Sequence, residues 1–152
     1  MILAKVSLTS PKGLQFTAET GHGHRLIIDD MVGHTGPKPI ELLAAALAGC
    51  TAFDVATILR NKKHKELKGY EVSVEAEQKQ SPPQVFTKVR IHHSIVGADI
   101  DVQSVEDAIE LSETKYCSVG AMVRQSGAEI TTTYSIRSDK DSEVGTITNS
   151  AA

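Results

Sequence analysis

The sequence predicts an α+β fold, and three features of the 152-residue chain support that prediction. Apolar and polar residues alternate over residues 2–28, residues 40–61 are rich in Ala and Leu without proline, and alternating segments resume at Gly69. A chain of this length can bury about 70% of its unfolded surface as one domain. We therefore expect a single domain over residues 1–137, followed by a polar, flexible tail over residues 138–152.

The N-terminal segment is predicted to be an antiparallel meander of three short strands. Apolar residues occupy alternate positions over residues 2–8 and 14–18, with the turn sequence Ser-Pro-Lys-Gly at 10–13 between them. Gly21 and Gly23 mark a second turn before a third strand over residues 25–28.

A helix of about five turns is predicted from Ile40 to about Asn61, with Pro39 in its first turn, where a missing N–H is tolerated. Apolar residues cover most of its circumference over residues 42–48, and a helix that is apolar all round is buried in a core or between subunits. Few strands are available to cover it, so we expect a homodimer that shares this helix.

The second half of the chain is predicted to alternate strands and helices. Strands are expected over residues 70–76, 85–96 and 130–136. Ser104, with Asp107 three residues later, is the expected N-cap of a helix that includes Val105, Ala108, Ile109 and Tyr116. A shorter helix is expected from Cys117 to Val123, closed by Gly127.

Composition excludes several classes of protein. Sixteen basic and nineteen acidic residues give a net charge of −3, without the basic surface that a nucleic-acid binder needs. The longest apolar stretch, residues 42–53, is interrupted by Gly49 and Thr51 and is shorter than the roughly 20 residues that span a bilayer. Residues 1–9 alternate around Lys5, unlike a signal peptide, so we expect a cytoplasmic protein without a membrane segment.

Cys50 and Cys117 are the candidate reactive residues, because a cysteine pair in a reducing compartment is more often catalytic or metal-binding than structural. Cys50 lies mid-helix, where it could equally be a small buried hydrophobe, and Asp54 one turn later would raise its pKa. Cys117 lies at a helix start, which favours its thiolate. Glu41, in the first turn of the long helix, could accept a proton or hold an arginine against a thiol, although a first-turn acid also suits the helix dipole.

A metal site is the alternative that the histidines offer. His22 and His24 flank Gly23 and could share a metal ion with cysteine ligands, but the cysteines lack the short spacing of a zinc motif. His92 and His93 point to opposite faces of one strand and cannot bind together. We therefore expect no native metal.

The run GPKPIELLAAALAGCTAFDV, residues 36–55, together with Tyr-Cys-Ser-Val at 116–119, resembles the OsmC/Ohr family of osmotically inducible and organic hydroperoxide resistance proteins. The resemblance covers nearly the whole chain and is closer to the OsmC-like branch than to Ohr itself. It implies an OsmC-like fold, in which antiparallel β-sheets wrap around a long central helix in an intertwined homodimer.

The resemblance also implies an activity, which is thiol-dependent reduction of organic hydroperoxides without haem, flavin or metal. Cys50 would be the peroxidatic thiolate and Cys117 the resolving thiol, and an external dithiol would reopen the Cys50–Cys117 disulfide. Ohr proteins support the thiolate with a glutamate near the helix start, which Glu41 matches, and with a meander arginine that has no counterpart before Arg25. This assignment opposes the local argument, which favours Cys117 as the more acidic thiol.

Two other functions remain open from the sequence. The first is an OsmC-like dimer that binds a small apolar ligand, with the cysteines as packing residues. The second is a redox sensor that uses the same cysteine pair without peroxidase turnover.

Overall fold

The computed structural model describes residues 1–137 and 142–147, which form two compact units, Met1–Leu43 and Ala44–Ala152. The boundary falls within the long helix α1, Pro39–Thr57, which continues into a π-helical turn, Ile58–Lys62. The expected single domain over residues 1–137 is not tested by this division and stays a prediction.

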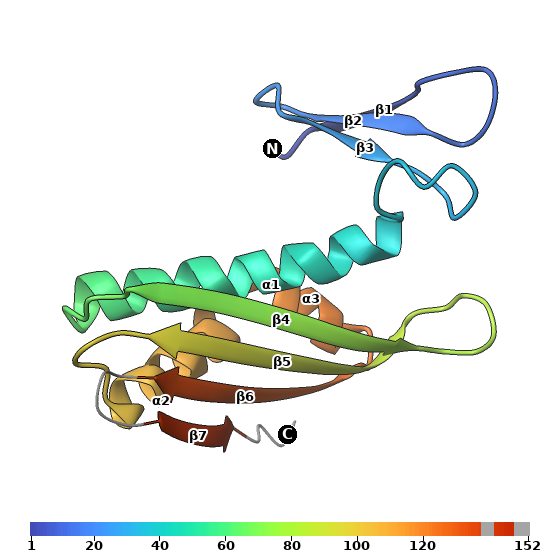
Figure 1. Ribbon diagram of the computed structural model, residues 1–152. Helices are drawn as coiled ribbons and strands as arrows, with labels where there is room; N and C mark the ends of the chain where they lie inside the picture. Colours follow the sequence, from blue (N-terminus) through green and yellow to red (C-terminus); the bar gives the residue numbers. More distant parts are fainter. Residues whose placement is uncertain (138–141, 148–152) are drawn as a thin grey trace. The chain divides into compact units, whose positions relative to one another are not determined.

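The first unit contains the predicted meander, labelled β1 to β3 in Figure 1. Its strands are β1, Ala4–Leu8, β2, Phe16–Thr20, and β3, Arg25–Ile28, and both neighbouring pairs are antiparallel. Apolar side chains on this sheet stay exposed, among them Val6, Leu8 and Leu26. Three short strands with an uncovered apolar face have little independent stability.

The second unit is built on a four-stranded sheet of order β4-β5-β6-β7. The strands are β4, Gly69–Gln78, β5, Phe86–Val96, β6, Glu129–Arg137, and β7, Ser142–Ile147. Strands β4 and β5 form an antiparallel hairpin, whereas β5 and β6 are parallel. A parallel pair needs a long crossover, which here consists of α2, Val102–Leu111, a π-helical turn, Ser112–Tyr116, and α3, Ser118–Gln125.

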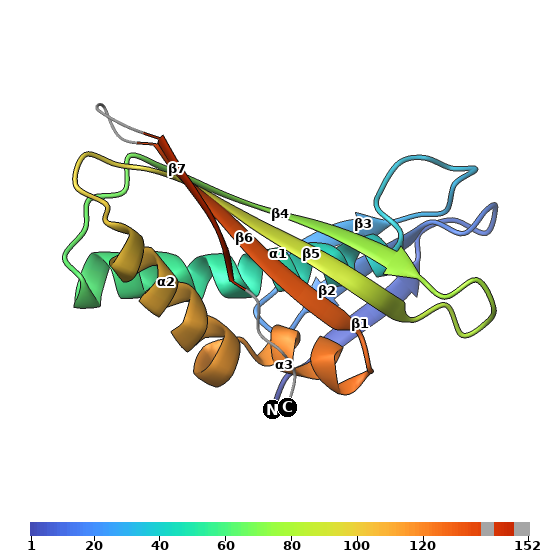
Figure 2. The same cartoon turned by 90° about the horizontal axis from the view of Figure 1, so that it is seen from below.

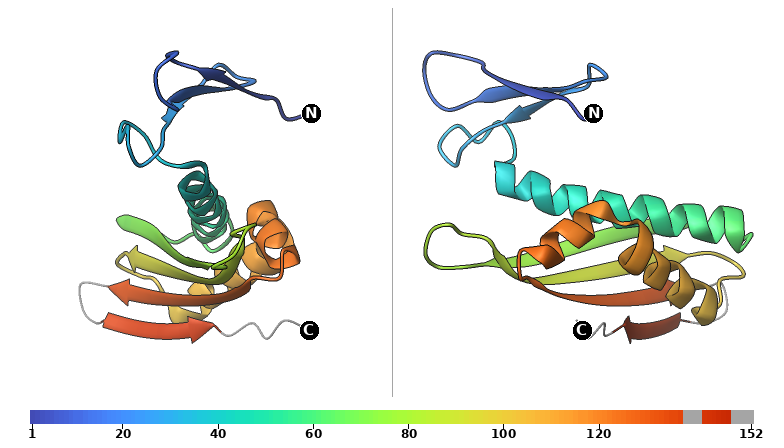
Figure 3. Two further views of the ribbon diagram at one scale, coloured as in Figure 1. Left: turned by 90° about the vertical axis from the view of Figure 1, so that its right-hand side faces the viewer. Right: turned by 180° about the vertical axis from the view of Figure 1, so that it is seen from behind.

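Helices cover one face of this sheet (Figures 2 and 3), and the core lies between the two layers. Alternate residues of β5 are buried, as a sheet with one covered face requires. The core cluster combines residues from the end of α1, from α2 and from β5 and β6: Val55, Ile58, Leu59, Ile95, Ile100, Val105, Ala108, Ile109, Tyr134 and Ile136.

Most predicted elements are confirmed, including the third strand at Arg25–Ile28 and the closure of α3 by Gly127, which has a φ of +90°. The predicted N-cap of α2 is wrong. Asp101 caps this helix by accepting hydrogen bonds from the backbone N–H and the hydroxyl of Ser104, both 2.8 Å long. Asp107 instead pairs with Lys63, whose Nζ lies 2.5 Å from Oδ2.

Within the predicted tail, Ser142–Ile147 forms strand β7 against β6, and the flexibility of the tail stays a prediction. Ile147 of this strand packs against the core cluster, and the polar residues that precede it form no alternating pattern that would predict a strand. The rest of the predicted tail, residues 138–141 and 148–152, lies outside the described residues.

Helix α1 is less buried than its composition predicts. Leu47, Thr51 and Val55 are buried, whereas the side chain of Phe53 is 79% exposed. Together with its π-helical turn, the helix Pro39–Lys62 is long and apolar enough to cross a membrane, whereas the apolar stretch of residues 42–53 alone is too short. A single such helix is weak support for a membrane span, because core helices of soluble proteins have the same properties.

Candidate functional site

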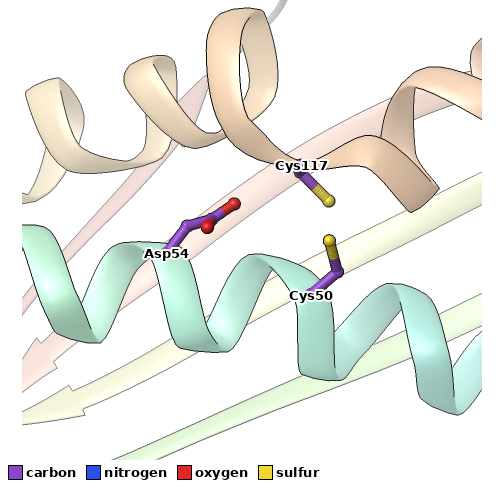
Figure 4. A group of neighbouring side chains, drawn as sticks. All are labelled: Cys50, Asp54 and Cys117. Carbon is purple, nitrogen blue, oxygen red and sulfur yellow. The ribbon is translucent and has the colours of Figure 1, made fainter. Parts of the chain in front are cut away.

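The two cysteines, which local sequence could not place relative to each other, lie together. Cys50 is in the middle of α1, and Cys117 is the N-cap residue of α3. Their sulfur atoms and a carboxylate oxygen of Asp54 all lie within 4.8 Å of one another. Figure 4 shows both thiols pointing toward each other, with Asp54 one helical turn along α1 on the same side.

Cys117 is held in place by the start of α3. Its sulfur accepts a hydrogen bond from the Gly120 N–H at 3.3 Å, and its own N–H donates to the Ser112 carbonyl oxygen at 2.8 Å. Glycine suits position 120, because a Cβ there would lie only 3.1 Å from the Cys117 sulfur. The cap geometry therefore fixes the sulfur on the side that faces α1.

Asp54 is oriented by a buried hydroxyl. The Ser112 hydroxyl donates to Asp54 Oδ2 at 3.1 Å and lies 3.2 Å from Thr51 Oγ1. Ser112 thus connects both sides of the site, through its side chain to Asp54 and through its carbonyl to Cys117. No local pattern in the sequence indicates Ser112, Thr51 or Gly120, whereas the four-residue spacing from Cys50 to Asp54 places these two on one side of a helix.

The structure opposes the local argument that the helix start favours the Cys117 thiolate. Burial raises the pKa of Cys117, and its hydrogen bond with Cys50 and the charges of Cys50 and Asp54 raise it further. The Gly120 N–H lowers this pKa but does not offset the burial, because the side chain of Cys117 is only 5% exposed. The raised pKa favours the protonated form of Cys117, and Cys50 is the more accessible of the two thiols.

Glu41 has a local role in the described structure. Its carboxylate accepts a hydrogen bond from the Lys38 backbone N–H at 2.8 Å, which is half of a capping box at the start of α1. Glu41 belongs to the first unit, and its predicted catalytic role stays a prediction. Arg25, in the same unit, pairs with Glu19 at 2.6 Å.

A second polar group, His93 with Tyr70, lies under the helices. His93 is fully buried, and its Nδ1 shares a 2.7 Å hydrogen bond with the Tyr70 hydroxyl, while Nε2 has no partner among the described residues. Burial lowers the pKa of His93 to about 4, with a smaller contribution from His92. Burial and the Asp54 charge raise the pKa of Tyr70, so both groups are neutral at pH 7.

The predicted opposite orientation of His92 and His93 is confirmed, since His92 hydrogen-bonds Thr133 and Ser135 on the other sheet face. His22 and His24 do not join a third histidine, cysteine or acidic residue to form a candidate metal cluster within the described ranges.

An apolar cavity of about 320 Å³ adjoins the site. It includes Asp54 in its lining, so it lies against the thiol cluster. Polar groups at its edge are Lys62 and the Tyr116 hydroxyl, 3.1 Å apart. The full lining is Phe53, Asp54, Thr57, Ile58, Lys62 and Tyr116.

Comparison with known proteins agrees with this fold. A family model described as "OsmC-like protein" matches residues 32–133. Protein YhfA of Escherichia coli K12 is 34% identical over 125 residues, which cover 82% of this chain and 92% of that protein.

Solved structures are similar as well. A hypothetical protein from Aquifex aeolicus has a TM-score of 0.80 and 25% identity, covering 92% of this chain and 98% of that one. An organic hydroperoxide resistance protein OsmC from Legionella pneumophila has a TM-score of 0.62 and 17% identity, covering 90% of this chain and 96% of that one, a likeness of fold alone. The fold is thus the α+β fold of these proteins, and the chain belongs to the OsmC-like protein family.

Proposed function

We propose that the protein is a thiol-dependent peroxidase that reduces organic hydroperoxides. The observation that carries the proposal is the placement of the Cys50 and Cys117 sulfurs within 4.8 Å of each other and of the Asp54 carboxylate. A disulfide has a sulfur–sulfur bond of about 2.05 Å, so the two sulfurs have to approach by less than about 3 Å to form one. Solved structures named as organic hydroperoxide resistance proteins share the fold.

In the proposed reaction Cys50 reacts first. Its thiolate attacks one peroxide oxygen, the O–O bond breaks, and the products are a Cys50 sulfenic acid and an alkoxide that takes a proton to become an alcohol. Cys50 suits this role because it is more exposed than buried Cys117. The Asp54 carboxylate lies within 4.8 Å of both sulfurs and marks the polar side of the site at which the peroxide group would be bound.

Cys117 then resolves the intermediate. Its thiol attacks the sulfenic sulfur, a disulfide forms and water leaves, so one hydroperoxide and two thiols give one alcohol, one disulfide and one water. An external dithiol reduces the disulfide. Burial raises the pKa of Cys117, which favours its thiol form before Cys50 reacts.

The cavity beside Asp54 is the proposed binding site for the organic part of the substrate. Phe53 and Ile58 provide apolar walls for a small aromatic or aliphatic group. This surface favours organic hydroperoxides over hydrogen peroxide.

We also propose that the protein acts as a homodimer. Apolar side chains of both units are exposed in the described chain, among them Val6, Leu8 and Phe53. Exposed apolar surface of this extent marks an interaction surface, and a second copy of the chain is the partner that OsmC-like proteins imply.

The test uses reduced, full-length protein with cumene hydroperoxide and dithiothreitol, measuring peroxide consumption. The Cys50→Ser variant should have no activity, whereas Cys117→Ser should complete one reaction and retain a sulfenic acid detectable with dimedone. Met122→Leu is the matched control. It removes an exposed sulfur outside the site, so this variant should keep the activity of the wild type. Activity of Cys50→Ser equal to that of the wild type would refute the assignment, and disulfide formation without turnover would identify a redox sensor instead.

A further inference from the structure

We propose that Cys50, Asp54 and Cys117 form a reversible binding site for Zn²⁺ that competes with peroxide for the reduced thiols. This inference goes beyond the proposed peroxidase activity, because the metal site depends only on the geometry of the three ligands and not on whether the protein turns over peroxide. Within the described ranges, this is the one group of three or more histidine, cysteine or acidic residues whose donor atoms lie close enough to share an ion.

The separations fit a tetrahedral site. Zn–S bonds of about 2.3 Å and Zn–O bonds of about 2.1 Å place two sulfurs about 3.8 Å apart and a sulfur and an oxygen about 3.6 Å apart. The donor atoms of Cys50, Asp54 and Cys117 already lie within 4.8 Å of one another. Each separation therefore needs to shorten by no more than about 1 Å, an adjustment within the range of side-chain rotation.

Two of the three ligands are already oriented by neighbouring groups. The Gly120 N–H donates to the Cys117 sulfur at 3.3 Å, and the Ser112 hydroxyl donates to Asp54 at 3.1 Å. Hydrogen bonds of this kind orient metal ligands and raise affinity, typically by tenfold to a hundredfold. Cys50 and Asp54 are also fixed relative to each other, because they are one turn apart on the same helix.

The ligand set selects the metal. Two thiolates and one carboxylate suit zinc, whereas Mg²⁺ and Ca²⁺ prefer all-oxygen sites. The two thiols release their protons when they bind the ion, so the three ligands then carry a charge of −3, of which a divalent cation neutralises two. The charged groups that act on Cys117 in the described structure are Cys50 and Asp54. Three protein ligands leave a fourth position for water, next to the apolar cavity.

Metal binding and peroxide reduction then exclude each other. Zinc engages both sulfurs, so neither is free to attack a peroxide. Conversely, once the ion has dissociated, a hydroperoxide oxidises the two thiols to a disulfide and yields an alcohol and water. The oxidised pair cannot bind the cation again until it is reduced, because a disulfide is a poor ligand for zinc.

The experiment titrates reduced, EDTA-treated full-length protein with Co²⁺ as a spectroscopic probe and then displaces it with Zn²⁺. The expected result is one Co²⁺ per chain, with a sulfur-to-metal charge-transfer band and the intense visible absorption of a tetrahedral site. Cys50→Ser and Cys117→Ser should lose the charge-transfer intensity, and Ser112→Ala should weaken binding by about tenfold.

The double variant His22→Gln/His24→Gln is the matched control and should bind the ion as the wild type does. Loss of binding in this control, or an unchanged charge-transfer band in both cysteine variants, would overturn the proposal. Circular dichroism verifies that each variant is folded. Peroxide turnover measured in EDTA separates the two proposals: turnover without Co²⁺ binding refutes the metal site alone, and binding without turnover refutes the peroxidase alone.

Discussion

Lowering the pH below 6.5 should destabilise the protein through His93. This imidazole is fully buried, and its pKa is lowered to about 4 from 6.5, chiefly because burial disfavours the charged form. The unfolded chain therefore binds a proton between pH 6.5 and pH 4 that the folded chain does not bind. Stability from neutral His93 is fully present above pH 6.5 and is lost as the pH falls toward 4.

The magnitude follows from the difference between the two pKa values. A difference of about 2.5 at 1.36 kcal/mol per pKa unit gives a loss of about 3 kcal/mol in the free energy of unfolding. This is a substantial fraction of the 5–15 kcal/mol that stabilises a typical domain, so the effect is measurable.

Urea unfolding at pH 7, 5.5 and 4.5, at fixed protein concentration, measures this loss in the wild type, in His93→Gln and in His92→Gln. Both variants keep the titrating carboxylates, so the difference from the wild type isolates each histidine. The His93 variant should lose most of the pH dependence in this range, whereas the His92 variant should keep it. If the free energy of unfolding falls equally with decreasing pH in the wild type and in His93→Gln, burial of neutral His93 does not control acid stability.

Three further predictions concern a helix cap, the thiol site and the subunit interface. Asp101→Ala removes the N-cap contacts with Ser104 and should lower the free energy of unfolding, measured in urea, by about 1–2 kcal/mol. An unchanged free energy of unfolding would show that this cap does not stabilise α2. Gly120→Ala places a Cβ 3.1 Å from the Cys117 sulfur and should slow peroxide-driven disulfide formation about threefold to tenfold in stopped-flow assays, and an unchanged rate would contradict the proposed positioning. Phe53→Glu should shift the dimer toward monomer in light scattering, because this side chain is 79% exposed in a single chain, and an unaltered mass would argue against α1 as the interface.

The sequence determines most of the secondary structure, because the signals are local. Alternation of apolar residues predicts β1 to β6, and Pro39 followed by an Ala- and Leu-rich run predicts α1. The cap of α2 could not be assigned with the same certainty, since Asp101 and Ser104 are both good N-cap residues and only the backbone geometry distinguishes them. Strand β7 was missed because Ser142–Ile147 is polar and includes Gly145, which lies against the Tyr134 hydroxyl, where a Cβ would collide with it.

The sequence by itself identified Cys50 and Cys117 as the residues of interest, from their positions within a helix and at a helix start and from the family motif. Only the tertiary structure decided that the two sulfurs lie together with Asp54, because their separation depends on how α1 and the crossover between β5 and β6 cover the same sheet. The relative acidity of the thiols also depends on the fold. Burial of Cys117 opposes the helix start, and burial is a property of the surrounding residues that no local pattern contains.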